Sequence, residues 1–289
     1  PCSHSSKACP GGIANQGCNS IIGATLVMNL RALPALTDNY IWMIHDGQKA
    51  VVIDPGEASP VQEALQQDAL ELSAILVTHR HMDHVAGIQQ LKGVLKGPVY
   101  GPSTATQDGV THVVGEGDSV DCLGLRLDVW HTPGHTQDHL SYVLLGHEPG
   151  NAESAPLIFC GDTLFSAGCG RLFDGTAAQL LNSLNRISTL PDSTLVCCTH
   201  EYTLSNLRFA RTVEPANVAL STYEQTCLQR RQQGLATLPA LLQTERAINP
   251  FLRCDRAQVM ASARQHGAVD GTPLSVFSAL RQWKNTFQA

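Results

Sequence analysis

The sequence predicts an α/β protein, with a mixed α/β domain followed by a helical second domain. Short β-rich segments separated by Gly, Pro, Asp and Asn occupy the chain up to about residue 205. Two segments among them show helical periodicity. From about Asn206 the pattern changes to longer polar and apolar periods without strand-like segments. We therefore expect domains at residues 28–205 and 206–289.

Seven segments of the first domain predict strands, because they are rich in β-branched or aromatic residues and end at turn residues. These segments are YIWMIHD (40–46), AVVIDPG (50–56), AILVTH (74–79), LRLDVWHTPGH (125–135), LSYVLLG (140–146), LIFCGD (157–162) and TLVCCTH (194–200). Residues 61–67 and 177–187 predict helices. In the second domain, Leu274, Phe277, Leu280 and either Trp283 or Lys284 recur at helical spacing and predict a C-terminal helix.

The composition is that of a globular protein, since 43% of the 289 residues are hydrophobic and 15% are charged. No segment has the roughly 18 to 20 uninterrupted apolar residues of a membrane span. Residues 1–27 lack the features of a signal peptide and show no hydrophobic period, so we expect a flexible leader or a non-native extension there. The expected protein is a cytoplasmic monomer that does not bind a membrane.

Charge differs between the two predicted domains. Residues 1–200 carry 9 Lys and Arg against 19 Asp and Glu, whereas residues 201–289 carry 10 against 6. The second domain therefore favours an anionic ligand. Its positive excess is too dilute for a nucleic-acid surface, and no basic run is interleaved with aromatic residues, so a small anion is the expected ligand.

The ten cysteines could indicate a disulfide framework. The chain is long, however, and contains no CxxC pair, and Cys197 and Cys198 are adjacent within an apolar run. We interpret the cysteines as small, reduced core residues.

The segment LVTHRHMDHVAG, which begins at Leu76, places four metal-binding side chains directly after a predicted strand. Three imidazoles and a carboxylate so close together would pack poorly without a partner. Further donors stand where other apolar runs end. The complete set of these strand-end donors is His79, His81, Asp83, His84, His131, His135, Asp162 and His200. Separate strands thus deliver such residues to one edge of a sheet, which predicts a metal site.

The number of donors indicates two ions, because a catalytic ion takes about three protein ligands and a water. Histidine and aspartate favour zinc, with iron or manganese as alternatives. Asp162 could bridge both ions, and the pair could hold a hydroxide at neutral pH, which predicts hydrolysis. No GxSxG motif competes for that role. We interpret the remaining histidines as ordinary surface or core residues, namely His4, His45, His112, His147 and His266.

The motifs THRHMDHVAG, TPGHTQDH, FCGDTLF and CCTHEY, in this order, resemble the signature of the metallo-β-lactamase superfamily. More specifically, DNYIW, GDTLFSAGCGRLFDGT, HEYTLSNLRFA and INPFLR resemble glyoxalase II, the hydroxyacylglutathione hydrolase family. The resemblance extends from about Met28 to the C-terminus. It implies a four-layer αββα metallo-β-lactamase sandwich followed by a C-terminal all-helical domain that binds glutathione.

The resemblance also implies a role for each donor. One metal ion would be held by His79, His81 and His135, the other by Asp83, His84 and His200, and both by Asp162. The implied reaction is hydrolysis of S-D-lactoylglutathione to D-lactate and glutathione, which completes methylglyoxal detoxification. Its nucleophile is a metal-bridging hydroxide held by these ligands, with Asp83 among the catalytic residues. A thiol of pKa about 8.5 leaves without a strong general acid.

Family glutathione contacts correspond to Arg171, Phe173, Tyr202 and Arg253. Some family members have Lys and Tyr at the first two positions, so one phenolic hydrogen bond is lost here. Whether Arg256 or Lys284 adds a basic contact stays open. Asp54 could orient a metal-bound histidine, although an Asp-Pro-Gly turn explains it nearly as well. His139 is ambiguous in the same way.

The alternative function is that of a persulfide dioxygenase, which shares the fold but uses a single iron and O₂. The complete second set of donors and the long helical tail argue against it. A non-catalytic binding module would be expected to have lost donors, whereas this chain keeps all seven of the implied set.

Overall fold

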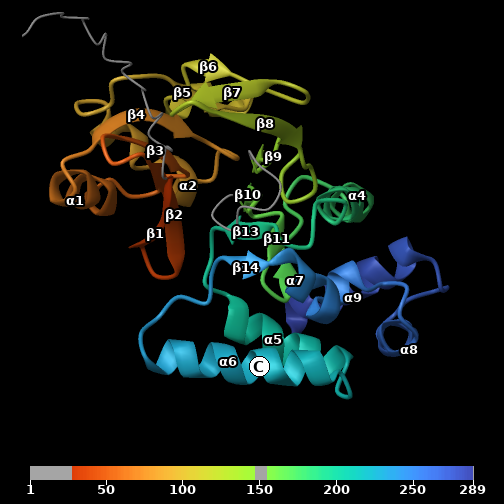
Figure 1. Ribbon diagram of the computed structural model, residues 1–289. Helices are drawn as coiled ribbons and strands as arrows, with labels where there is room; N and C mark the ends of the chain where they lie inside the picture. Colours follow the sequence, from red (N-terminus) through yellow and green to blue (C-terminus); the bar gives the residue numbers. More distant parts are fainter. Residues whose placement is uncertain (1–27, 147–154, 289) are drawn as a thin grey trace, which may run out of the picture.

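The computed structural model describes residues 28–146 and 155–288 (Figure 1). The leader predicted at residues 1–27, together with His4 and His147, lies outside the described residues.

The first sheet has six strands in the order of the sequence. They are β1 (Asn29–Ala35), β2 (Asn39–His45), β3 (Lys49–Ile53), β4 (Glu71–Leu76), β5 (Val99–Gly101) and β6 (His112–Val113). The first three strands pair antiparallel, and β3 to β6 pair parallel. The helices of this part are α1 (Ser59–Gln67), α2 (Met82–Val85), α3 (Ile88–Leu91) and the 3₁₀ helix η1 (Ser103–Asp108).

The second sheet has the order β14-β13-β10-β9-β8-β7. Its strands are β7 (Ser119–Cys122), β8 (Leu125–His131), β9 (Leu140–Leu144), β10 (Leu157–Gly161), β13 (Leu195–Cys198) and β14 (Ala240–Leu241). Helix α4 (Ala177–Ile187) precedes β13, and a small hairpin of β11 (Leu164–Phe165) and β12 (Gly168–Cys169) follows β10. All seven predicted strands and both predicted helices of the first domain are therefore present.

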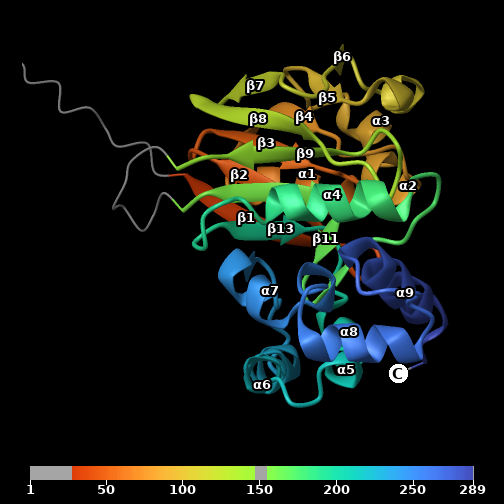
Figure 2. The same cartoon turned by 90° about the vertical axis from the view of Figure 1, so that its right-hand side faces the viewer.

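The two sheets pack face to face, with α1 outside the first and α4 outside the second (Figures 1 and 2). In strand β2, alternate residues are buried on opposite faces of the first sheet. Tyr40, Trp42 and Ile44 belong to the core shared with the second sheet, whereas Ile41 and Met43 belong to the core shared with α1. Because alternate side chains of a strand point to opposite faces, β2 is buried on both sides. The αββα sandwich is confirmed.

The C-terminal part is helical and lies below the sandwich in Figure 1. It contains α5 (Thr203–Val213), α6 (Val218–Gln232), α7 (Leu242–Ile248), the 3₁₀ helix η3 (Pro250–Leu252), α8 (Ala257–Gln265) and α9 (Pro273–Thr286). One detail differs from the prediction of a segment without strands. Ala240 and Leu241 form β14, which pairs with β13 and covers what would otherwise be an open sheet edge.

The cysteine interpretation is confirmed for the described residues. All seven cysteines there are free, and all but Cys122 are buried. Among the described residues, no helix combines the length and the apolarity needed to cross a bilayer.

Candidate metal centre and adjoining cavity

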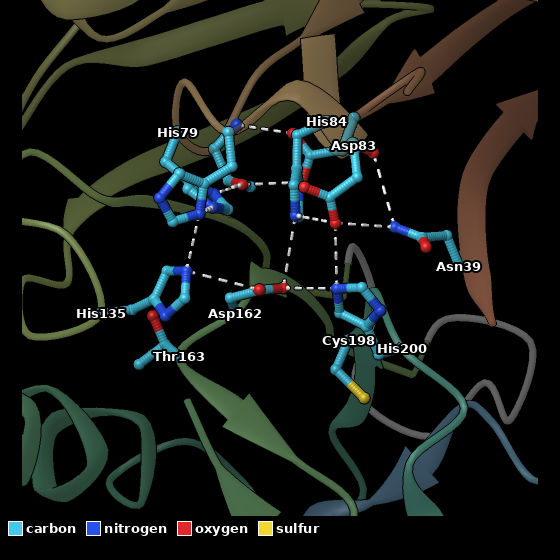
Figure 3. Close-up of polar contacts among 12 residues, drawn as sticks. Asn39, His79, Asp83, His84, His135, Asp162, Thr163, Cys198 and His200 are labelled. Atoms are coloured by element: carbon cyan, nitrogen blue, oxygen red, sulfur yellow. Dashed lines mark hydrogen bonds and ion pairs between the residues drawn. The ribbon is translucent and has the colours of Figure 1, made fainter. Parts of the chain in front are cut away.

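Seven donor side chains meet where strands of both sheets end (Figure 3). The loop after β4 and the short helix α2 carry the first four of them. The others come from the β8–β9 loop and from the residues that directly follow β10 and β13. The seven are His79, His81, Asp83, His84, His135, Asp162 and His200. His131 is exposed and lies apart from this group.

Three histidines form one group of donors. The Nδ1 atom of His81 lies 3.0 Å from Nε2 of His79 and 3.1 Å from Nε2 of His135. Four ligands placed tetrahedrally about 2.1 Å from a zinc ion are about 3.4 Å from one another. The spacing of the three nitrogens is close to that value.

The second group contains a carboxylate and two histidines. Asp83 Oδ2 lies 3.3 Å from His200 Nε2 and 3.5 Å from His84 Nε2. Asp162 stands between the two groups, with Oδ2 at 3.4 Å from His135 Nε2 and Oδ1 at 3.5 Å from Nε2 of both His84 and His200. One carboxylate thus offers an oxygen to each group.

Four of the five histidines have a partner for the ring nitrogen that points away from the centre. Nδ1 of His79 lies 3.0 Å from the Thr78 hydroxyl, and Nδ1 of His135 lies 2.9 Å from the carbonyl oxygen of Arg171. The other two face carboxylates, at 2.9 Å for His84 and Asp54 and at 2.8 Å for His200 and Asp38. Such partners fix the ring orientation and leave Nε2 free to bind a metal.

Asp54 therefore stands where it could orient a ligand histidine. Its carboxylate also accepts hydrogen bonds from the backbone and hydroxyl of Thr78. The backbone of Asp54 is left-handed, with φ of 55°, a conformation that is uncommon for a non-glycine residue. His139, whose role the sequence left open, is buried and accepts a hydrogen bond from the backbone N–H of Asp162.

Three buried atoms at the centre lack a hydrogen-bond partner among the described residues. His84 Nδ1 has the Asp54 carboxylate as an ion-pair partner at 2.9 Å, whereas His84 Nε2 and Asp162 Oδ1 stand among the metal donors. An unsatisfied buried polar atom costs about 1 to 3 kcal/mol. A divalent cation between the groups would satisfy both atoms. The residues present therefore fit a pair of metal ions.

The charges at the centre also favour a cation. Burial lowers the pKa of His200, but the carboxylates of Asp162 and Asp83 outweigh burial and raise it to about 10. Burial alone would raise the pKa of Asp162, but the nearby imidazoles of His84 and His200 hold it well below its usual range. Burial lowers the pKa of His79 well below normal, as suits a neutral ligand.

A cavity of about 530 Å³ adjoins the donors and extends toward the helical part. It is lined by His81, Asp83, His135, Asp162, Phe165, Cys169, Arg171, Phe173, His200, Tyr202, Ser205, Asn206, Arg281, Lys284, Asn285 and Phe287. Its volume lies in the usual range for small-molecule sites. Three of the lining residues, Arg171, Arg281 and Lys284, are cations, so the cavity suits an anionic ligand.

Two of these cations come from helix α9. The buried Arg281 donates to the carbonyl oxygens of Cys169 at 2.8 Å and Gly170 at 3.2 Å, while its Nε has no partner among the described residues. Lys284 donates to the carbonyl oxygen of Ser205 at 3.3 Å. Burial first, and then the charge of Arg281, lower the pKa of Lys284 to about 8.

Phe173 and Tyr202 lie on either side of the metal-binding side chains. The exposed ring of Phe173 packs edge-on against His81 and His135, with ring centroids 4.8 and 5.0 Å apart. The ring of Tyr202 stacks on His200 with centroids 4.6 Å apart. Three of the four predicted substrate contacts, Arg171, Phe173 and Tyr202, therefore line the cavity.

The structure does not bring Arg253 to this cavity, contrary to the expectation from the sequence. Its guanidinium forms two hydrogen bonds with the buried carboxylate of Glu214, at 2.7 and 2.9 Å, and a third with the carbonyl oxygen of Arg246. Arg256 is exposed and also lies outside the cavity. Of the two alternatives left open, Lys284 is the one that the fold places at the site.

Three residues near the site were not predicted from the sequence. Asp38 and Asn39 contact donors that are far from them in the chain, which no local pattern indicates. Arg281 could have been found, because it stands four residues after Phe277 on the apolar face of the C-terminal helix. A cation in such a face calls for an explanation.

Two family models match the chain. The model described as metallo-beta-lactamase superfamily covers residues 36–200, and the model described as hydroxyacylglutathione hydrolase C-terminus covers residues 201–287. The hydroxyacylglutathione hydrolase of Albidiferax ferrireducens is 49% identical over 90% of this chain and 100% of its own. That of Nitrosomonas eutropha is 46% identical over 88% and 97%. The solved structure of the B3 metallo-beta-lactamase BLEG-1, with a TM-score of 0.57 and 23% identity over 78% of this chain and 99% of that one, supports the fold.

Proposed function

The chain belongs to the hydroxyacylglutathione hydrolase family of the metallo-β-lactamase superfamily, and on this basis we propose that it hydrolyses S-D-lactoylglutathione to D-lactate and glutathione. One observation carries the proposal. A complete set of seven metal donors adjoins a cavity that is also lined by the cations Arg171, Arg281 and Lys284. The donors suit the hydrolytic chemistry, and the cations suit the carboxylates of the tripeptide.

The proposed metal ions are two zinc ions, with iron or manganese as alternatives. His79, His81 and His135 would hold one, Asp83, His84 and His200 the other, and Asp162 would bridge them. Divalent ions bound there supply a water of lowered pKa as nucleophile and polarise the thioester carbonyl. The partners of the outer ring nitrogens keep the histidines in the orientation that this binding requires.

The cavity wall would recognise the glutathione part of the substrate. Lys284 and Arg171 are the proposed partners of its carboxylates, since no ion pair with an acidic side chain is found for either of them among the described residues. Arg281 lies deeper and would contribute its charge and its unpaired Nε. Phe173 and Tyr202 would enclose the thioester between them, beside the metal-binding histidines.

The two parts of the chain then have separate tasks. We propose residues 28–205 as the catalytic domain and residues 206–289 as the glutathione-binding domain. Residues before Asn206 that line the cavity, such as Tyr202 and Ser205, sit at the junction. The monomeric state, the cytoplasmic location and the absence of a nucleic-acid partner stay predictions from the sequence.

The alternative of a persulfide dioxygenase with a single iron is not favoured. A single ion would need only one group of donors, whereas both groups are assembled here with spacings suited to metal ligands. An oxygen-consumption assay separates the two reactions, because hydrolysis consumes no O₂.

The direct test uses metal-loaded protein and two substrates. We expect rapid thiol release from S-D-lactoylglutathione and much slower release from the lactoyl thioester of a short thiol without carboxylates. Equal rates on both would contradict the role of these cations. Loaded protein that cleaves neither thioester would contradict the proposed function.

A further inference from the structure

The β1–β2 turn, defined as residues 36–39 so that it includes Asn39, the first residue of β2, reaches two donors of a single metal group. Asp38 Oδ1 lies 2.8 Å from Nδ1 of His200. The side-chain amide of Asn39 donates to Asp83 Oδ2 at 3.1 Å and, at 3.5 Å, to the carbonyl oxygen of the same residue (Figure 3). Two adjacent residues of one turn therefore hold two of the three ligands that would share one ion.

The other metal group has no such link to the turn among the described residues. His79 has Thr78 as the partner of its outer nitrogen, and His135 has the carbonyl oxygen of Arg171. These partners come from the loop after β4 and from the segment after β12. A change in the turn should therefore leave the first group undisturbed.

The backbone fixes the turn against the opposite sheet. Tyr40 N–H donates to the carbonyl oxygen of Thr199 at 2.6 Å, and Glu201 N–H donates to the carbonyl oxygen of Asp38 at 2.8 Å. Asn39 and His200 form an isolated antiparallel bridge. The turn of the first sheet is thus tied to the end of β13 in the second sheet, on both sides of the donor His200.

The turn conformation is itself constrained. Leu36 has a left-handed backbone with φ of 51°, and its N–H donates to the carboxylate of Glu57 at 3.0 Å. Such a conformation costs about 1 kcal/mol or more for a leucine, so it persists where the surroundings fix it. The side chains of Asp38 and Asn39 are therefore presented in one defined position.

In the group of Asp83, His84 and His200, hydrogen bonds from the turn are needed to hold Asp83, because packing alone does not. The side chain of Asp83 is 36% exposed, so neighbouring atoms alone do not fix its rotamer. The amide of Asn39, which is buried, supplies the missing restraint by a hydrogen bond to the oxygen that faces His84 and His200. Asp38 accepts a hydrogen bond from the proton that His200 carries on Nδ1. The lone pair of Nε2 is then free to bind the metal ion.

We propose that the turn of residues 36–39 selectively controls the metal ion held by Asp83, His84 and His200. Asp38 and Asn39 are positioning residues, because each acts through a ligand. Losing either contact should weaken that ion alone, by about 10- to 100-fold, as is typical when the partner of a metal ligand is removed. The inference rests on the two-ion site of the proposed function.

The test measures zinc binding rather than activity. Apo forms of the unaltered protein, Asn39→Ala and Asp38→Ala would be titrated with zinc against a chelator of known affinity. We expect two tight ions for the unaltered protein, and one tight and one weakened ion for each variant. Asp38→Asn should restore most of the affinity, since an amide oxygen can still accept the proton of His200 Nδ1.

A matched control lies at the other end of β2. Asp46 accepts hydrogen bonds from the N–H groups of Gln48 and Lys49 in the β2–β3 turn, so Asp46→Ala disturbs a similar turn without touching a donor. It should retain two tight ions. If Asn39→Ala fails to fold, the comparison of Asp38→Ala with Asp38→Asn decides.

Two results would overturn the inference, namely unchanged binding of both ions in the variants or equal weakening of both. The unaltered protein separates this failure from that of the proposed function. If it binds fewer than two ions, or binds two and cleaves no thioester, the function itself fails. If it binds two ions and cleaves the thioester, the zinc affinities of the variants alone decide whether the turn has the proposed role.

Discussion

Arg253 and Glu214 form a two-pronged ion pair in the helical part of the molecule, with Nε at 2.7 Å and Nη2 at 2.9 Å from the two carboxylate oxygens. The side chain of Glu214 is only 4% exposed and that of Arg253 is 18% exposed. The hydrogen bonds that Arg253 donates to Glu214 raise the pKa of Arg253. The guanidinium of Arg253 is thus already paired with a carboxylate of the same chain.

Arg253→Ala should therefore reduce stability and not substrate binding. Removing it leaves a buried carboxylate without its counter-charge, which costs about 2 to 4 kcal/mol for a pair at this depth. Denaturant unfolding would measure the loss, and KM for S-D-lactoylglutathione should stay within about twofold. A large rise in KM at unchanged stability would instead indicate that Arg253 binds the substrate. Glu214→Gln in the same background should recover part of the lost stability.

Lys284→Ala should produce the opposite result. Lys284 lines the cavity, so its loss should remove a charge-assisted contact with a carboxylate that is remote from the reacting bond. We expect KM to rise about 10- to 100-fold with kcat nearly unchanged, since such a contact acts equally on substrate and transition state. Arg256→Ala, at an exposed cation outside the cavity, is the matched control and should leave KM unaltered. A fall in kcat without a change in KM would contradict the assignment.

The pH dependence of KM should depend on Lys284. Because its pKa is lowered to about 8, the amine is protonated below that pH and loses its charge as pH rises through it. KM should therefore rise from about pH 8 upward in the unaltered protein. Lys284→Arg keeps the charge at all these pH values, so the rise should disappear in this variant. A rise that persists in Lys284→Arg would have to come from another group.

Glu245 should make stability depend on pH in a definite direction. This fully buried carboxylate accepts hydrogen bonds from Ser166, from the backbone N–H of Ala167 and from Asn249. Burial nevertheless raises its pKa from the ordinary 4.5 of a glutamate to about 7. Between these two values the folded state holds more protons than the unfolded state, so stability falls as pH rises toward 7 and then levels off.

The measurement compares Glu245→Gln with the unaltered protein. The difference in Tm, unaltered minus variant, should decrease from pH 5 to pH 7.5, because the amide does not ionise. Taking the difference removes the contribution of the metal-binding groups, which both proteins share. A difference that is constant across this range would contradict the raised pKa.

Much of the metal centre could be predicted from the sequence, because its donors follow strands that short apolar segments of the sequence already predict. His79, His81, Asp83 and His84 come directly after the apolar run of β4, and Asp162 and His200 follow β10 and β13. The carboxyl ends of neighbouring parallel strands meet at one edge of a sheet, which brings Asp162 and His200 together after β10 and β13. The packing of the two sheets then brings these donors to those that follow β4. Asp54 could be suggested by the same argument.

The residues that the sequence could not identify are those whose partners are distant in the chain. Asp38 and His200 are 162 positions apart, and their contact depends on how one sheet packs on the other. Arg253 and Lys284 are both basic residues of the helical part, and composition cannot say which one faces the cavity. Only the packing of α9 against the β11–β12 hairpin, through Arg281 and Cys169, settles that choice.

The central claim is that thioester cleavage depends on two metal ions held by the seven donors. The most direct test removes the metal with a chelator and then adds zinc stepwise, with metal content and the rate of S-D-lactoylglutathione hydrolysis measured on the same samples. The account predicts that activity is lost on removal and returns fully only at about two ions per chain, and that His81→Ala binds less metal and stays inactive. Metal-free protein with full activity, or full activity at a single ion per chain, would contradict it.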